Sequence, residues 1–149
     1  MSEWSNGPYR VTTDAERLDL GVIHGFLRGS YWAAGIPEEL LRRAIRGSLC
    51  FGLLEHERQV GFARVVTDRA SFAYLADVFV LESHRGRGLG PWLLECVTSH
   101  PDLQGLRRFC LVTRDAHGLY RKFGFTPLAH PERHMAMDRP DLYLEQEAS

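Results

Sequence analysis

Residues 84–90, with the sequence HRGRGLG, place three glycines and two arginines between a strand-like and a helix-like pattern. The run before them, at 75–81, is almost continuously apolar, whereas Leu89, Leu93 and Val97 fall on one face of a helix. Glycine permits a tight turn, and the first amide groups of a helix lack intrahelical acceptors and therefore attract anions. We therefore expect a strand, a glycine-rich turn and a helix in succession, with a phosphate-binding site at the turn.

Two well-known glycine motifs that bind phosphate do not fit this turn. The nucleoside-triphosphatase loop requires Gly-Lys-Ser/Thr, which the sequence GLGPW lacks. The dinucleotide fingerprint requires a glycine where this chain has Pro91 or Leu93. That fingerprint also belongs near the start of a parallel βαβ unit, whereas this turn follows a predicted hairpin. The anion is therefore expected to be a different phosphate ligand.

Hydrophobic periodicity along the rest of the chain predicts a mixed α/β fold. Apolar and alternating runs predict strands at 9–13, 48–55, 59–68, 71–81 and 106–113, and a terminal strand within 124–137. Helical spacing predicts helices at 19–29 and 37–45, after the glycine turn, and at 115–123. The order β-α-α-β-β-β-α-β-α-β predicts a single domain over residues 1–149, with one mixed central sheet flanked by helices.

Composition and charge exclude several classes of protein. The formal net charge of −1 argues against nucleic acid or an anionic membrane surface as a partner. No apolar run approaches the roughly 18 residues of a membrane span, and the opening MSEWSNGPYR does not resemble a signal peptide. Cys50, Cys96 and Cys110 have apolar neighbours and no metal-ligand spacing, which predicts reduced thiols and no metal site. We therefore expect a cytoplasmic protein.

Two motifs together resemble the GNAT superfamily of N-acetyltransferases. The acetyl-CoA signature of that family, Q/R-x-x-G-x-G/A after a strand with D-x-x-V, is similar to Arg85-Gly86-Arg87-Gly88-Leu89-Gly90 after Asp77-Val78-Phe79-Val80. A second signature, A-x-x-x-Y followed by G-F, is similar to Ala116, Tyr120, Gly124 and Phe125. The motifs have the expected order, and the resemblance covers about residues 48–138.

The resemblance implies acetyl-CoA as co-substrate and assigns residues that bind it. The CoA diphosphate is expected on the turn formed by Arg85, Gly86, Arg87, Gly88, Leu89, Gly90 and Pro91. The pantetheine arm is expected beside Val78, Phe79 and Val80, where the family's strand splays from its neighbour and a backbone N–H polarises the thioester carbonyl. Thr113 replaces an asparagine that contacts the pantetheine region in many relatives, and its hydroxyl can make one such bond.

The resemblance also implies two residues that act in catalysis. Tyr120 is expected to protonate the departing CoA thiolate, since a phenol with a pKa of about 10 can act as such an acid. Its alternative role is packing beside Leu119 and Phe123. Asp77 is expected either to accept the amine proton or to contact a cationic substrate, and a base acting through water remains an equal alternative.

The sequence says less about the residues that would bind the acetyl acceptor. Tyr31 and Trp32, in the loop GSYWAAGIP, either face a substrate pocket or cover the edge of the core. Arg64 and Asp68 are expected to be solvated charges at a strand end. The leading hypothesis is an N-acetyltransferase that acetylates a primary amine of a small metabolite by direct attack in a ternary complex. The alternatives are a protein N-terminal or lysine acetyltransferase and a non-catalytic CoA-binding module, and a homodimer is left open.

Overall fold

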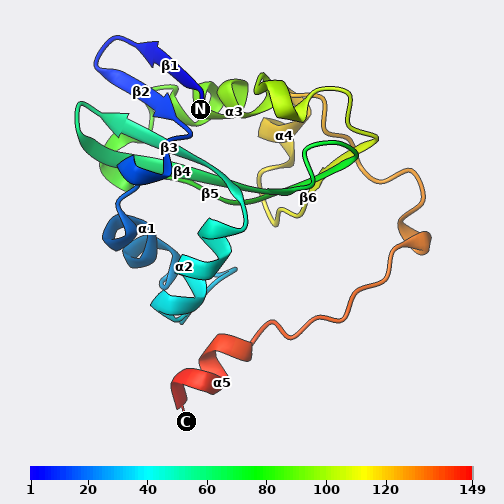
Figure 1. Ribbon diagram of the computed structural model, residues 1–149. Helices are drawn as coiled ribbons and strands as arrows, with labels where there is room; N and C mark the ends of the chain where they lie inside the picture. Colours follow the sequence, from blue (N-terminus) through cyan, green and yellow to red (C-terminus); the bar gives the residue numbers. More distant parts are fainter. Residues whose placement is uncertain (149) are drawn as a thin grey trace.

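The computed structural model describes the backbone of residues 1–148 and the side chains up to Glu145 (Figure 1). Its one sheet has six strands in the order β1-β2-β3-β4-β5-β6, so each strand lies beside its neighbour in sequence. The strands are β1 (Glu3–Asn6), β2 (Tyr9–Thr12), β3 (Leu49–Glu55), β4 (Arg58–Thr67), β5 (Phe72–Val80) and β6 (Arg108–Leu111). All neighbouring pairs are antiparallel except β5 and β6, which are parallel.

Helices cover both faces of the sheet (Figure 1). They are α1 (Leu20–Leu27), α2 (Glu38–Arg46), α3 (Leu89–Thr98), α4 (His117–Arg121) and α5 (Leu142–Ala148). The carboxylate of Asp19 caps α1 by accepting from Val22 N at 3.2 Å, and Pro37 immediately precedes α2. None of the described helices is both long and apolar enough to cross a membrane.

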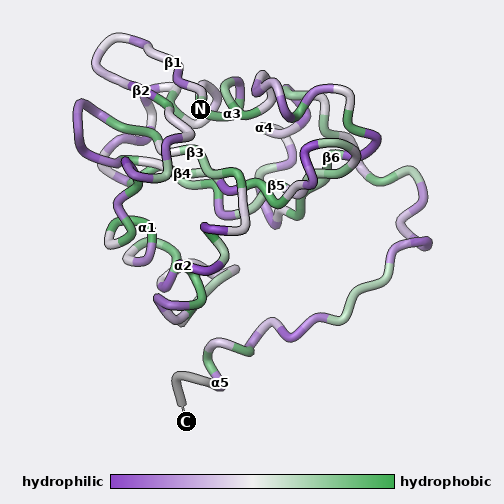
Figure 2. Tube along the Cα trace, in the orientation of Figure 1, coloured by the Kyte–Doolittle hydropathy of each residue, from purple (hydrophilic) through white to green (hydrophobic). Residues whose placement is uncertain are grey.

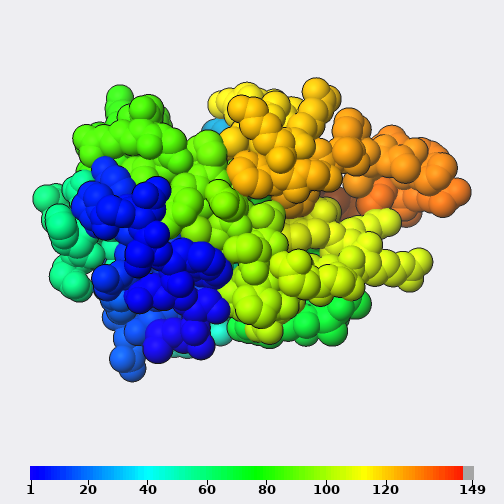
Figure 3. All heavy atoms as spheres, turned by 90° about the horizontal axis from the view of Figure 1, so that it is seen from above, coloured from blue at the N-terminus to red at the C-terminus, as the bar shows by residue number. Residues whose placement is uncertain are grey.

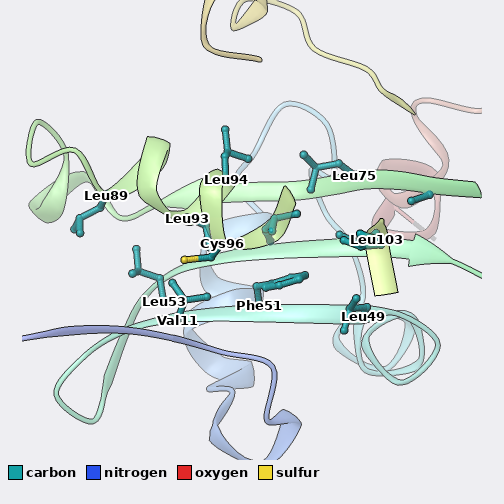
Figure 4. Close-up of a cluster of buried hydrophobic side chains, with 14 of the residues drawn as sticks. Val11, Leu49, Phe51, Leu53, Leu75, Leu89, Leu93, Leu94, Cys96 and Leu103 are labelled. Atoms are coloured by element: carbon teal, nitrogen blue, oxygen red, sulfur yellow. The ribbon is translucent and has the colours of Figure 1, made fainter. Parts of the chain in front are cut away.

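The core consists of two apolar layers, one on each side of the sheet. The layer between the sheet and α3 includes Phe51 and Leu75 from the strands and Leu93 from the helix (Figure 4). The layer on the side of α1 and α2 includes Ile23, Phe62 and Phe79. Hydrophobic residues follow the strands and the inner helix faces, and hydrophilic residues dominate the turns (Figure 2).

A β-bulge at Asp77 divides β5 into two parts. Asp77 has a φ of 54°, and the register between β4 and β5 shifts at this point. Before the bulge Leu75 packs against the α3 side, whereas Phe79, four residues later, packs against the α1 side. Residues an even number apart should share a face of a regular strand, so the extra residue reverses the faces for the rest of β5.

The fold class agrees with the prediction, whereas the predicted order of elements needs three corrections. Strand β1 is additional, because the polar sequence EWSN carries no strand-like alternation and forms a strand by pairing with β2. The terminal strand predicted within 124–137 is wrong for this structure, since that segment holds only a 3₁₀ turn at Pro131–Arg133 and pairs with no strand. Helix α5 follows it and was not predicted.

Candidate active site

The glycine turn forms an open surface at the N-terminus of α3. Gly86 and Gly88 have φ values of 78° and 76°, a left-handed conformation that favours glycine. Gly88 is the N-cap residue of α3, and no side chain in the described part of the chain caps this helix end. A Cβ atom added at Gly86, Gly88 or Gly90 would meet no heavy atom within 4 Å. The turn therefore leaves amide groups and free space for an anionic ligand.

The two arginines of the turn are held by neighbouring groups. Arg85 donates from Nε to the Val80 carbonyl oxygen at 3.2 Å. Arg87 donates from Nη1 to the Tyr9 hydroxyl at 2.9 Å, and this bond raises the pKa of Arg87. Glu55 lies 3.8 Å from the same guanidinium. Contacts with Tyr9 on β2 and Glu55 on β3 therefore orient the Arg87 side chain.

His84 and Glu55 extend this network and were not identified from the sequence. His84 Nε2 lies 3.1 Å from Glu55 Oε1, and the Ser83 hydroxyl lies 2.7 Å from His84 Nδ1. The bond to His84 is the main cause that lowers the pKa of Glu55. The sequence did place Glu55 at the end of a predicted strand. Glu55 and His84 are 29 residues apart, however, so their pairing could be recognised only from the fold.

Beyond the bulge, β5 separates from β6. Their parallel pairing runs from Phe72↔Arg108 to Leu75↔Leu111 and stops there. Pairing of β5 with β4 continues as far as Gly61↔Val80, so residues 76–80 have no strand partner on the β6 side among the described residues. This free edge begins at the bulge and ends close to the glycine turn, which gives an extended ligand a continuous backbone to follow.

Three residues predicted to contact pantetheine, Val78, Phe79 and Val80, lie on this free edge. Phe79 is 5% exposed, and its ring stacks on Phe26 with the ring centroids 4.1 Å apart. Its side chain therefore belongs to the core, and only its backbone can meet a ligand. Val78 and Val80 are half-buried.

Asp77 is the centre of a hydrogen-bonded group beside this edge. Its Oδ1 accepts from Trp32 Nε1 at 2.9 Å, and its Oδ2 accepts from Arg64 Nε at 2.7 Å. The Asp77 side chain is 8% exposed, and Arg64 also donates to the Ser48 hydroxyl at 3.1 Å. Both carboxylate oxygens already accept a bond, which suits anchoring of Trp32 as well as contact with a cation.

Tyr31 and Trp32 lie at the surface above Asp77. The two residues are 53% and 40% exposed, and their rings meet edge to face with the centroids 5.1 Å apart. The guanidinium carbon of Arg114 lies 3.8 Å from the centroid of the Tyr31 ring. Trp32 also approaches Phe26 with 6.2 Å between the ring centroids, so Trp32 takes part in covering the edge of the core.

Tyr120 lies on α4, half-buried, with its ring 6.0 Å from that of Phe125. Burial raises the pKa of Tyr120, and the charge of Tyr31 adds to the shift, so the two phenols lie within electrostatic range. Thr113 Oγ1 accepts from the backbone N–H of Ala116 at 3.1 Å and so supports the start of α4. This bond leaves the Thr113 hydroxyl proton available to another acceptor.

The expectation for Arg64 was wrong, since it is not a solvated charge but the ion-pair partner of Asp77. Its position two residues after the buried Phe62 places it on the same strand face, which was a usable signal. Asp68 is exposed as expected, and its carboxylate closes the turn before β5 by accepting from Ala70 N, Ser71 N and Phe72 N. Arg114 had no signal in the sequence, because only the fold brings it over Tyr31.

Comparisons with known proteins agree with this geometry. The family profile described as the acetyltransferase (GNAT) domain matches residues 46–127. A curated protein of Gibberella zeae, provisionally named an acetyltransferase, is 35% identical over 142 residues, which cover 80% of this chain and 79% of that protein.

Solved structures extend the comparison. A crystal structure from Xanthomonas campestris pv. campestris, provisionally named an acetyltransferase of the GNAT family, is 54% identical. It covers 91% of this chain and 96% of its own, with a TM-score of 0.89. A protein of Clostridium acetobutylicum, described as a predicted acetyltransferase with acetyl-CoA, has the same fold at 14% identity and a TM-score of 0.62, covering 87% of this chain and 94% of its own. This chain therefore belongs to the GNAT family of acetyltransferases and is an acyltransferase.

Proposed function

We propose that the protein transfers the acetyl group of acetyl-CoA to a primary amine of a small metabolite, with both substrates bound together. One observation carries this proposal: the uncapped turn at α3 lies at the end of the unpaired edge of β5. A diphosphate on the turn and an extended arm along the edge would lead toward Asp77 and Tyr120. Acetyl-CoA has both of these parts.

The residues present fit acetyl-CoA as co-substrate. Gly86, Gly88 and Gly90 leave open space where the diphosphate would meet the backbone amides. Arg85 and Arg87 add positive charge beside the turn. The free backbone of Val78 and Val80 can pair with the amides of the arm, as an added strand pairs with a sheet edge.

In the proposed reaction, the neutral amine nitrogen attacks the carbonyl carbon of the thioester. A C–N bond forms and the C–S bond breaks, while a backbone N–H of β5 stabilises the oxygen that becomes negative. The departing thiolate takes the phenolic proton of Tyr120, which solvent later restores. The raised pKa of Tyr120 keeps its proton in place through neutral pH.

The amine must lose a proton, and the proposed role of Asp77 is to hold the amine while water carries that proton away. Its two oxygens already accept from Trp32 and Arg64, so direct uptake of a proton would compete with both bonds. A carboxylate has further lone pairs and can accept a third bond from an ammonium group. Tyr31 and Trp32 would then contact the rest of the acceptor.

The exposed aromatic pair and the guanidinium of Arg114 support a small acceptor. The ring of Tyr31 is covered on one face by Arg114, and Trp32 is fixed through its indole N–H. Trp32 bonds to Asp77 and contacts Tyr31 edge to face, and such a closely spaced group suits a compact amine better than an extended polypeptide. An acceptor that also carries a carboxylate could be paired by Arg114.

Calorimetric titration of the purified protein with acetyl-CoA, CoA and ATP tests the turn. We expect acetyl-CoA and CoA to bind and ATP to bind at least tenfold more weakly. In Gly90→Glu the new Cβ atom meets no protein atom and the backbone φ is not positive, so the fold should persist while a bulky negative side chain lies where the diphosphate would bind. We expect Gly90→Glu to weaken CoA binding at least tenfold.

Gly25→Glu is the matched control, because it adds the same side chain in open space on another helix, α1. It should leave CoA affinity unchanged. Equal affinity in Gly90→Glu and Gly25→Glu would exclude the turn as the diphosphate site. A screen of small amines and peptides by thiol release then separates a metabolite acceptor from a protein acceptor.

A further inference from the structure

The glycine turn has little of its own to hold its conformation. Gly86 and Gly88 both have a left-handed backbone, and glycine loses more conformational freedom on ordering than any other residue. Within the described part of the chain, the N–H groups of residues 86–90 donate to no backbone oxygen. Ordering these groups when a ligand binds would weaken the affinity, unless contacts outside the turn hold it beforehand.

One carboxylate contacts the chain on both sides of Gly86. Glu55, at the end of β3, has Oε1 3.1 Å from His84 Nε2 and Oε2 3.8 Å from Arg87 Nη1. Arg87 also donates from Nη2 to the Ser83 carbonyl oxygen at 3.4 Å and so closes the turn on itself. Figure 3 shows the N-terminal strands in blue next to the green segment that leads into α3. We call the contacts of Glu55 with His84 and Arg87 the Glu55 bridge.

The hydrogen bonds around the Glu55 bridge are chemically matched. A carboxylate only accepts, so His84 donates to it from Nε2, and Nδ1 of the same ring accepts from the Ser83 hydroxyl at 2.7 Å. The Tyr9 hydroxyl accepts from Arg87 at 2.9 Å, and Tyr9 lies opposite Glu55 in the register of β2 and β3. The bond to His84 and, to a smaller extent, the Tyr9 hydroxyl lower the pKa of Glu55, so this carboxylate is ionised at neutral pH.

The charge of Glu55 by itself opposes the binding of an anion. A negative charge close to a phosphate site repels the ligand, and the Glu55 side chain is only partly exposed, at 30%, so water screens it incompletely. Glu55 also offsets part of the positive charge of Arg87. An acid at this place therefore favours a bound diphosphate only through its effect on the conformation of the turn.

We propose that Glu55 is a positioning residue for the CoA diphosphate. By holding His84 before Gly86 and Arg87 after it, Glu55 fixes the turn in the conformation that presents its amides before the ligand arrives. Glu55 acts through these two residues and not by touching the ligand. This inference rests on the proposed function, because it takes the turn as the diphosphate site.

Replacement by glutamine gives a test whose sign separates positioning from repulsion. Glu55→Gln keeps the length of the side chain, but its single carbonyl oxygen cannot accept from both His84 and Arg87. We expect CoA to bind about tenfold more weakly, as calorimetric titration would measure. Repulsion alone predicts tighter binding, because the variant removes a negative charge. Equal or tighter binding of CoA by Glu55→Gln overturns the proposal.

Glu57→Gln is the matched control, since it makes the same charge change two residues away. The Glu57 side chain is 87% exposed, and it lies 3.8 Å from Arg17, outside the turn. We expect its CoA affinity to stay within about twofold of that of the unchanged protein, because water and salt screen an exposed charge. An equal loss in Glu57→Gln and Glu55→Gln would contradict the proposal, since the loss would then not depend on contact with the turn.

A double-mutant cycle tests whether Glu55 acts through Arg87. Arg87→Ala removes one of the two contacts of the Glu55 bridge and should itself weaken CoA binding. Adding Glu55→Gln in this background should then weaken binding only about two- to threefold, less than in the unchanged protein. An equal factor in both backgrounds would show that Glu55 acts independently of Arg87, which is the opposite of what we propose.

Amide hydrogen exchange, resolved by residue with NMR, measures the order of the turn without any ligand. The N–H groups of His84, Arg85 and Trp92 donate to backbone oxygens in and beside the turn at 2.9, 3.3 and 3.2 Å. We expect these groups to exchange about tenfold faster in Glu55→Gln and at unchanged rates in Glu57→Gln. Unchanged exchange in Glu55→Gln would overturn the proposal even if its CoA affinity fell, because the loss would not come from the turn.

The titration also separates this inference from the proposed function. If the unchanged protein binds CoA and Glu55→Gln binds it equally well, only the positioning role fails. If the unchanged protein binds no CoA, the proposed function fails and the positioning role fails with it. Weaker CoA binding and faster exchange in Glu55→Gln, with neither change in Glu57→Gln, would support the Glu55 bridge.

Discussion

At the scale of single residues, Tyr120 is the side chain whose environment most suits proton transfer. Tyr120→Phe removes the hydroxyl but keeps the ring contact with Phe125. We expect the kcat to fall roughly 10²- to 10⁴-fold with little change in the KM for acetyl-CoA, since only the acid is lost. Initial rates of thiol release across neutral and alkaline pH measure this effect. Tyr31→Phe is the control, and an equal loss in both variants would argue against Tyr120 as the acid.

Asp77 and Arg64 are expected to depend on each other. Asp77→Asn keeps the shape and tolerates the positive φ, but leaves the largely buried guanidinium of Arg64 without its counter-charge. We expect the free energy of unfolding to fall by about 1–3 kcal/mol. Adding Arg64→Met should cost less in the Asp77→Asn background than in the unchanged protein, as chemical denaturation of all four proteins would measure. Additive losses would show that the pair is not coupled.

His100 makes the stability of the protein depend on pH. The residue is 6% exposed, and its ring contacts Phe51 edge to face and accepts from Asp102 N through Nδ1. Burial lowers the pKa of His100 from the ordinary 6.5. Below that pH the unfolded chain takes up a proton before the folded one does, so stability is greatest above 6.5 and falls as the pH drops.

The measurement is denaturant unfolding of His100→Asn between about pH 5 and 7. Asparagine keeps an acceptor near Nδ1 but does not titrate, so stability should depend less on pH than in the unchanged protein. The exposed His56 has a positive φ that asparagine tolerates, and His56→Asn is therefore the control. An unchanged pH dependence in His100→Asn would assign the effect to other groups.

At the scale of elements, the spacing between β4 and β5 depends on Gly61. A Cβ atom there would lie 2.8 Å from Leu53 Cδ2 and 2.9 Å from the carbonyl oxygen of Phe79. The first contact can relax through a side chain, whereas the second requires movement of β5. We expect Gly61→Ala to lower the free energy of unfolding by about 1–3 kcal/mol and to weaken CoA binding. Gly25→Ala should do neither, and a fully stable Gly61→Ala would show that β5 moves at little cost.

Hydrophobic periodicity was sufficient to predict the helices and strands that bury a continuous apolar face. The sequence patterns predicted the strands from β3 to β6 and the helices from α1 to α4, and the glycine turn lies where they placed it. The bulge at Asp77 was not predicted, because residues on both sides of it are apolar and the change of face leaves no gap in the pattern. The pairing of Asp77 with Arg64 depends on that bulge and on the register of β4.

The segment 124–137 shows a different limit of sequence reading. Its sequence predicted a terminal strand, yet a strand also requires a neighbour that pairs with it, and among the described residues this segment pairs with no strand. The acceptor-side contacts have the same limit, since Trp32 and Asp77 are 45 residues apart and meet only after both layers of the core have formed.

At the scale of the whole molecule, the proposed CoA site would couple stability to ligand concentration. A ligand that binds the folded chain and not the unfolded one stabilises the fold by mass action. We expect the Tm of the unchanged protein to increase over a hundredfold range of acetyl-CoA concentration. The Tm of Gly90→Glu should increase less, as differential scanning fluorimetry would measure. An equal increase in both proteins would mean that the ligand does not bind at the glycine turn.

The left-handed backbone at Asp77 affects how conservation of this position among related proteins should be interpreted. Aspartate, asparagine and glycine are the residues that most readily adopt such a backbone, so the bulge itself restricts which amino acids can occupy the position. Descendants that had lost acetyl transfer but kept the bulge would still be selected for the same few residues. Conservation of an acidic residue at this position could therefore result from the backbone geometry of the strand alone. A role of that residue in catalysis has to be shown by kinetic measurements.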